Sequence, residues 1–198
     1  SRRSASTHGP SSPDGGPGER YRSATKTMPD ALHIASINFR EDDGSLPTVE
    51  FDQLNAESVA AVYRFICKHG RCVSDSPTVW DNNEQVDVPL MLLDDPCRWL
   101  RDGRIDSFHC CFGGISVDGT VIPDLGLFVF KDAVQIDYRM GTEWNAINVD
   151  AFFRMLAYLK SIAPESKIKS AESEGLMDEE SFLTALRPYL TEGGRTKP

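Results

Sequence analysis

The sequence predicts an α+β fold, in which helices pack on one face of an antiparallel β-meander sheet. Residues 106–138 contain apolar and alternating stretches separated by turn residues, as expected for consecutive strands. Residues 146–162 then repeat apolar side chains at helical spacing, in a stripe wide enough to cover a sheet. Together these two segments predict a folded core in the second half of the chain.

The first two strands of the meander are expected over 106–117 and 120–130. Asp118-Gly119 between them is a dipeptide favoured by tight two-residue hairpins. Pro123 cannot donate a hydrogen bond to a neighbouring strand, so we expect a bulge or a break early in the second strand. The later half of that strand is apolar on both faces and should be central in the sheet.

A turn at Lys131-Asp132 leads to a third strand that should be half buried and half solvated. Its buried face is expected to consist of alternate apolar residues: Val134, Ile136, Tyr138 and Met140. Asn145 should cap the helix that follows, and Pro164 should end it.

Before the meander, Leu32, Ile34 and Ile37 suggest a strand that pairs as a hairpin with a second strand at 47–54. Asn55 is expected to cap a helix over 56–69, in which Val59, Val62, Tyr63 and Ile66 recur at helical spacing. Gly70 should end this helix.

Three weaker elements are also expected. Residues 77–93 are expected to form an edge strand, because Pro89 lies among their apolar residues. Residues 95–102 are expected to form a short helical turn, because Pro96 suits a first helical position. A last helix near 178–190 should begin at an Asp178 cap and be disturbed by Pro188. The buried face of this helix is expected to be Phe182, Leu186 and Leu190.

Composition divides the chain of 198 residues into one globular domain, 29–190, with a tail at each end. Residues 1–28 are rich in Ser, Gly, Pro and charge, and residues 191–198 look similar, so both are expected to be disordered. The N-terminal tail has five Lys and Arg against two acidic residues, a net charge of +3. The whole chain carries −9, which leaves −12 on residues 29–198.

This charge argues against nucleic-acid binding, which draws most of its affinity from Lys and Arg. An acidic surface instead favours solubility and attraction to basic partners. The sequence has no apolar run of membrane-spanning length, and its five cysteines are an odd number, which fits reduced thiols in a cytoplasmic protein. We therefore expect no membrane association.

Two groups of cysteine and histidine are candidates for chemical sites. Cys67, His69 and Cys72 lack the paired spacing of structural zinc sites, so a buried thiol at a helix end is the preferred interpretation, and no metal or cofactor is expected. His109 and Cys111 share a face of the expected strand and, with a carboxylate such as Asp137, would form the site of a small thiol or imidazole enzyme. Packing on the sheet is the simpler explanation.

The segment from the third strand to the helix is the preferred site for a protein partner. Aromatic, Arg and acidic side chains gather there, and these residue types anchor protein interfaces. The candidate partner-binding residues are Asp137, Tyr138, Arg139, Glu143 and Trp144. In the alternative interpretation Trp144 is a hydrophobic staple that folds back over the helix, and Arg139 only pairs with a neighbouring carboxylate.

Over residues 105–165, the stretch LGLFVFKDAVQIDYRMGTEW with its following helix resembles small bacterial proteins of the polymorphic-toxin immunity type. This resemblance implies a binding protein that neutralises a cognate toxin by occluding it, without catalysis. The negative charge of residues 29–198 indicates that such a toxin would have a basic surface. Besides the small enzyme, a structural subunit of a bacterial assembly remains an alternative, and an exposed apolar patch would indicate it.

Overall fold

A computed structural model describes residues 30–40, 43–172 and 175–192 of the chain. In these residues the main sheet has six strands, all of whose neighbouring pairs are antiparallel. In spatial order they are β10 (Lys167–Ser170), β1 (Thr48–Asp52), β9 (Val134–Tyr138), β8 (Leu125–Val129), β5 (Phe108–Gly113) and β2 (Arg71–Cys72). The tail expected at 1–28 and most of the tail expected at 191–198 lie outside the described residues, although Thr191 and Glu192 belong to the last helix, and the division into a single domain stays a prediction.

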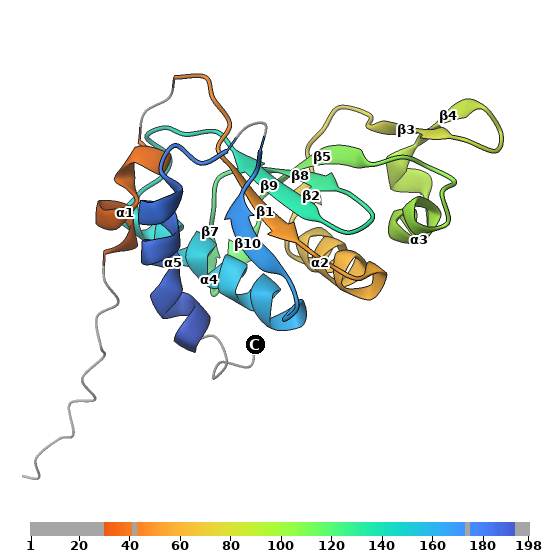
Figure 1. Cartoon of the computed structure of the whole chain (residues 1–198). Coiled ribbons are helices and arrows are strands. Elements are labelled where there is room, and N and C mark those ends of the chain that lie inside the picture. Colours follow the sequence, from red (N-terminus) through yellow and green to blue (C-terminus); the bar gives the residue numbers. More distant parts are fainter. Residues whose placement is uncertain (1–29, 41–42, 173–174, 193–198) are drawn as a thin grey trace, which may run out of the picture.

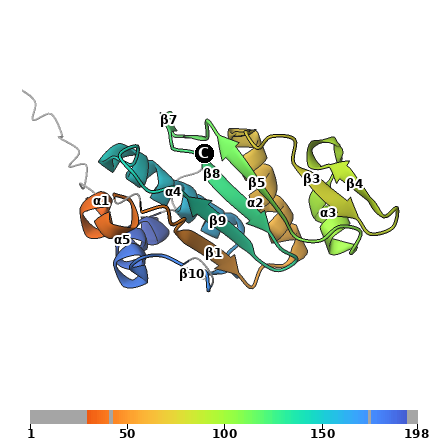
Figure 2. The same ribbon diagram turned by 90° about the horizontal axis from the view of Figure 1, so that it is seen from above.

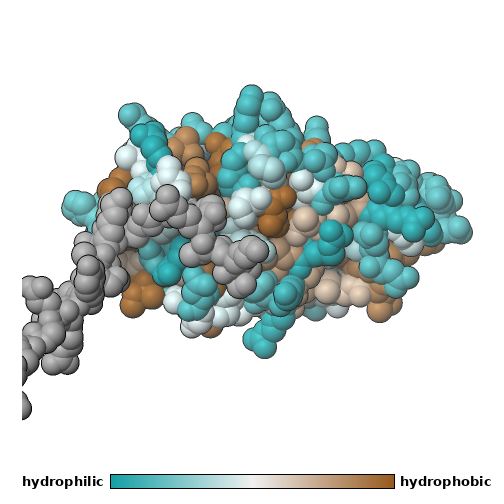
Figure 3. Space-filling model, turned by 90° about the horizontal axis from the view of Figure 1, so that it is seen from below, coloured by the Kyte–Doolittle hydropathy of each residue, from teal (hydrophilic) through white to brown (hydrophobic). Residues whose placement is uncertain are grey.

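Helices α2 (Ala56–His69) and α4 (Ala146–Ile162) lie on one face of this sheet, and the opposite face is turned to the viewer in Figure 2. The α+β class with helices on one face of an antiparallel sheet is therefore confirmed. Seen from the helix side, the surface is largely hydrophilic with hydrophobic residues scattered over it (Figure 3). Most apolar side chains of α2 and α4 are thus buried and their polar faces are exposed, as the helical spacing of the apolar residues predicts.

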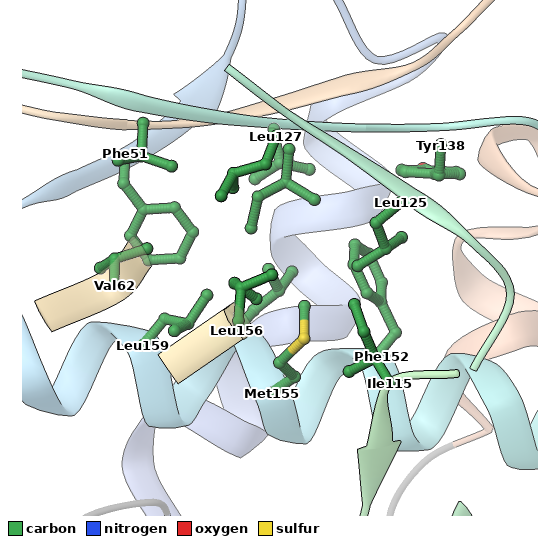
Figure 4. Packing of buried hydrophobic residues seen from close by; sticks show 14 of the residues in the cluster. Phe51, Val62, Ile115, Leu125, Leu127, Tyr138, Phe152, Met155, Leu156 and Leu159 are labelled. Carbon is green, nitrogen blue, oxygen red and sulfur yellow. The ribbon is translucent and has the colours of Figure 1, made fainter. Parts of the chain in front are cut away.

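The core lies between the sheet and α4. Leu125 and Leu127 of β8 point towards Phe152, Leu156 and Leu159 of the helix (Figure 4), and all five are buried. The buried face expected for the third strand is confirmed as well, since Val134, Ile136 and Tyr138 of β9 and Met140 just beyond it are all buried. One hydrophobic cluster joins these residues to the buried faces of α2 and of the helices at the chain ends.

The Asp118-Gly119 turn sets the register of the central hairpin. Both residues have positive φ, as a tight hairpin turn requires. They connect β6 (Ser116–Val117) to β7 (Thr120–Val121), and the pairs of β5 with β8 keep the same symmetry about the turn. The break expected at Pro123 is confirmed, because the second strand is interrupted between Val121 and Leu125. The continuous first strand expected over 106–117 is wrong, since it is interrupted after Gly113.

The caps predicted for both long helices are confirmed. Asn55 Oδ1 accepts hydrogen bonds from the backbone of Glu57 and Ser58, and Asn145 Oδ1 accepts from Ile147 and Asn148. The bounds of α2 and α4 match the expected 56–69 and 146–162. The two cap side chains fix where each helix begins because they satisfy backbone N–H groups that have no partner within the helix.

The strand expected around Leu32 is wrong, and so is its hairpin with β1. The chain instead forms α1 (Ala31–Ile34), capped by Asp30, and the 3-10 helix η1 (Ser36–Asn38). The edge position beside β1 is occupied by β10, in which Ser170 lies opposite Val49. This strand was not expected, because Lys167–Ser170 contains a single large apolar residue.

Residues 77–93 form a hairpin of their own and do not join the main sheet as an edge strand. It consists of β3 (Thr78–Asp81) and β4 (Val86–Pro89) and continues into the 3-10 helix η2 (Leu90–Leu92). With α3 (Pro96–Arg101), this hairpin lies at the end of the molecule opposite α1 and α5 (Figures 1 and 2). The short helix expected at 95–102 is confirmed.

The last helix, α5 (Glu179–Glu192), is confirmed with its Asp178 cap, whose Oδ1 accepts from the backbone of Ser181. Its buried face differs at one position, since Leu190 is 37% exposed and Tyr189 is buried in its place. No helix in the described chain is long and apolar enough to cross a membrane.

Candidate functional site

The two aromatic residues of the candidate partner site lie in the core. Tyr138 is 1% exposed and Trp144 is 3% exposed, and their rings are 5.1 Å apart. The Trp144 indole also packs on Phe39 and Phe152, and its Nε1 donates a hydrogen bond to the backbone oxygen of Arg139 at 2.8 Å. This geometry favours the staple interpretation of Trp144, in which the ring fastens the strand-to-helix segment to the core.

The three charged residues of the same segment lie differently. Arg139 and Glu143 are exposed, whereas the Asp137 side chain is nearly buried on the open face of the sheet. A hydrogen bond joins Asp137 Oδ2 to His109 Nε2 over 3.0 Å. The sequence segment is therefore not one continuous surface, and a partner that met it would contact Arg139 and Glu143.

A row of interacting side chains crosses the open face at the level of His109. The His109 ring stacks on Phe128, with ring centroids 4.1 Å apart. Gln135 Nε2 donates to Glu50 Oε2 at 2.9 Å, and Lys169 Nζ lies 3.3 Å from Glu50 Oε1 and 3.0 Å from Asp52 Oδ2. We call this set the polar row; in strand order from β5 to β10 it comprises His109, Phe128, Gln135, Glu50 and Lys169.

The polar row follows from the register of the five strands that carry it. Each residue lies directly opposite the next on the neighbouring strand, where cross-strand side chains are close enough to interact. Phe128, between His109 and Gln135, remains 38% exposed. The row thus forms an ordered surface that the helices do not cover.

The thiol site considered from the sequence is only partly assembled. Cys111 lies on the same face as His109, and its backbone N–H donates to Ser74 Oγ at 2.7 Å. Burial raises the pKa of the Cys111 thiol, which disfavours the reactive thiolate. Among the described residues no hydrogen bond joins Cys111 to His109, so the histidine is paired with a carboxylate but not with a nucleophile.

The cysteines and histidine near the end of α2 are packed as structural residues. Burial raises the pKa of the Cys67 thiol, and the His69 ring stacks on Phe65 with centroids 4.3 Å apart. Within the described ranges, no group of three or more His, Cys, Asp or Glu side chains is arranged to hold a metal ion.

A second surface was missed by the sequence reasoning. Residues 75–95 contain no Lys, Arg or His, but six acidic residues: Asp75, Asp81, Glu84, Asp87, Asp94 and Asp95. The segment also exposes four large apolar side chains: Trp80, Val86, Met91 and Leu92. We call residues 75–95 the acidic arm. In the sequence, Asp81, Glu84 and Asp87 lack the pattern of a calcium loop and Asp94-Asp95 is an ordinary turn or cap pair, so only the absence of any cation could have indicated this surface.

The acidic arm is bonded to the body of the protein at the turn of its hairpin, through Asp81. Arg104 donates two hydrogen bonds to Asp81 Oδ2, at 2.7 Å and 3.0 Å, and its guanidinium carbon lies 3.5 Å from the centroid of the Trp99 ring. Asp81 Oδ1 accepts from the backbone of Asn83 and Glu84. The bonds from Arg104 are the main reason why the pKa of Asp81 lies below its usual value.

Comparison with known proteins found one distant likeness. No family model and no curated protein matches the sequence. A chain in the crystal structure of the toxic C-terminal tip of CdiA from Pseudomonas aeruginosa in complex with immune protein is similar, with 18% identity and a TM-score of 0.41. The match covers 66% of this chain and 88% of that chain. A likeness of this degree does not assign a function.

Proposed function

We propose that the protein is a binding protein that occludes a protein partner, and that it acts as an immunity protein against a bacterial toxin. The observation that carries this proposal is the polar row, an ordered surface left open on a sheet whose other face is covered. An interface that is already rigid loses less conformational entropy when a partner binds. Binding without catalysis needs such a surface and no reactive group.

Charge supports a partner with a basic face. Residues 29–198 carry a net −12. On the open face itself, Glu50, Asp52 and Asp137 lie beside Lys167, Lys169 and His109, so the support comes from the charge of the whole domain. A net negative charge steers a basic protein into contact and speeds its association. The exposed ring of Phe128 would add apolar contact area at the centre of the open face.

The enzyme alternative is weaker because its nucleophile is not activated. Burial raises the pKa of Cys97 and Cys110 to about 12 and also raises those of Cys67 and Cys111. We expect these four thiols to react slowly with iodoacetamide at pH 7.5, more slowly than free cysteine, because little thiolate is present. Rapid alkylation of Cys111 alone would instead favour a thiol enzyme.

Co-expression tests the binding proposal. The protein encoded by the neighbouring gene would be expressed in a bacterial host with and without this chain, and growth would be followed. We expect the neighbouring protein to stop growth and this chain to restore it. Failure to restore growth under full expression of both proteins would contradict the immunity role.

A pair of matched variants tests the polar row in the same assay. Phe128→Ala removes a 38% exposed apolar side chain from the row, and Val121→Ala removes a 58% exposed one from the β6–β7 hairpin. The proposal predicts that Phe128→Ala restores growth less well and that Val121→Ala behaves as the unaltered chain. Equal rescue by both would show that the row is not the contact.

A further inference from the structure

We propose that the acidic arm docks onto a Lys- and Arg-rich face of the protein partner, with Trp80 as the apolar anchor. This inference rests on the proposed function and names a contact surface and a partner chemistry for it. Trp80 is 43% exposed, whereas the other two tryptophans are buried or stacked under Arg104. An exposed Trp needs an explanation, because tryptophan is among the residues most enriched at the centres of protein interfaces.

The hairpin register points Trp80 away from the protein body. Val79 and Asp81, its two neighbours in β3, are buried, and side chains alternate along a strand. Trp80 therefore lies on the outer face, directly opposite Asp87 of β4. A cationic side chain of a partner could therefore form an ion pair with the Asp87 carboxylate and a cation–π contact with the Trp80 ring.

The outer face is rigid before any partner arrives. The Asp81 carboxylate is bound by Arg104, and Asn82 N–H donates to the backbone oxygen of Arg104 at 2.7 Å. At the other end of the hairpin, Leu90 N–H donates to the oxygen of Pro77 at 2.8 Å, and Leu90 is buried. The turn of the hairpin is thus bonded to the body, and its open end is closed by a backbone hydrogen bond beside the buried Leu90, which reduces the entropy lost on docking.

The negative charges of the acidic arm favour a basic protein partner. Its exposed carboxylates are Asp75, Glu84, Asp87, Asp94 and Asp95, and in the described chain none of these five takes part in an ion pair. The nearby cations are already engaged, since Arg98 and Arg101 pair with Asp102, and Arg104 pairs with Asp81. A partner rich in Lys and Arg would supply the missing counter-charges, whereas nucleic acid would be repelled.

The arm also exposes Met91 and Leu92 in η2, and Leu92 is 77% exposed. Apolar side chains that gather with an exposed Trp on one projection mark an interaction surface more strongly than scattered ones. In this arrangement the carboxylates steer the encounter and the apolar side chains slow dissociation.

Binding kinetics test this inference on the full chain. The probe is the purified protein encoded by the neighbouring gene, with its own activity inactivated, and association and dissociation are followed on a sensor surface. Trp80→Ala should raise Kd by about 30-fold, mostly through faster dissociation. The triple variant Glu84→Gln, Asp87→Asn, Asp94→Asn should associate with the probe more slowly, and its association rate should depend less on salt concentration. Val121→Ala serves as the exposed apolar control, and unchanged melting temperatures confirm folding.

The outcomes separate this inference from the proposed function. If the unaltered chain binds the probe and both arm variants bind equally well, the arm is not the contact, and the proposed function stands. If the unaltered chain neither binds the probe nor restores growth, the proposed function fails and the arm assignment fails with it. If instead the chain self-associates in sedimentation experiments and Trp80→Ala abolishes this, the arm joins two copies and the basic partner is refuted.

Discussion

The carboxylate of Asp137 occupies the space that a side chain at Gly126 would fill. These residues lie opposite each other on β9 and β8, and a Cβ added to Gly126 would overlap both carboxylate oxygens of Asp137. The missing side chain lets Asp137 extend across β8 to reach His109 on β5. A glycine in a central strand weakens the strand itself, and here it makes room for a partly buried polar contact.

Replacing Gly126 by Ala should therefore destabilise the fold by about 1–3 kcal/mol, the usual cost of inserting atoms into a packed site. The carboxylate must move, so the hydrogen bond between His109 and Asp137 should be lost. Denaturant unfolding would give the change in stability, and a crystal structure of the variant would show the separation of the two side chains.

A double-mutant cycle provides the control for this prediction. In an Asp137→Ala background the overlap is removed, so Gly126→Ala should cost clearly less than in the unaltered chain. Additive costs would mean that the strain at Gly126 does not come from Asp137.

Trp144→Ala should destabilise the protein by about 3–5 kcal/mol, because it empties a buried site lined by Phe39, Tyr138 and Phe152. Trp80→Ala is the matched control and should change stability by about 0.5 kcal/mol or less, since Trp80 is a surface residue. Thermal and denaturant unfolding of both variants would measure this contrast. If the Trp144→Ala protein were as stable as the unaltered chain but failed to bind its partner, Trp144 would be a partner-binding residue and not a staple.

Tyr138→Phe should raise stability by about 1 kcal/mol. Within the described chain, Tyr138 Oη is the buried side-chain polar atom that lacks a hydrogen-bond partner, and burial raises the pKa of this phenol well above its ordinary value. Removing the hydroxyl removes an uncompensated desolvation cost. The melting temperature of the variant checks this, and a clear decrease would indicate that the hydroxyl is satisfied in solution.

Stability should fall as the pH drops from 6 to 3. Hydrogen bonds from Lys169, Arg104 and Ser58 hold the pKa values of Asp52, Asp81 and Glu165 below their usual values. Carboxylates with lowered pKa in the folded state contribute stability above their unfolded pKa, and this contribution disappears as the pH falls through the folded pKa.

Melting temperatures across this pH range give the measurement. Asp81→Asn supplies the control, because it removes one titrating group; its melting temperature should be lower at pH 6 and should fall less towards pH 3. An unaltered chain with a flat profile would show that these carboxylates do not stabilise the fold.

Elements with strong local signals were predicted correctly from the sequence. Asn55 and Asn145 cap α2 and α4 through contacts within the first turn, so the bounds of these helices follow from nearby residues. The Asp118-Gly119 turn likewise predicted the register of β5 and β8, because pairing about a two-residue turn is determined by counting outward from it.

Features that depend on distant segments could not be predicted in this way. β10 is short and polar, and it becomes a strand only because β1 offers an open edge. Trp144 could be an anchor or a staple until Phe39, far away in the sequence, is seen packed against it. The acidic arm was overlooked because exposure of Trp80 depends on which face of the hairpin meets the body, which the local pattern of β3 does not specify.

The central claim is that the protein acts by saturable binding of a basic protein and makes or breaks no bond. Isothermal titration of the full chain with the purified, inactivated product of the neighbouring gene tests it most directly. The account predicts a stoichiometric complex whose affinity decreases as salt is raised and from which both proteins are recovered chemically unchanged. Absence of binding at low salt, or covalent alteration of either protein, would contradict it.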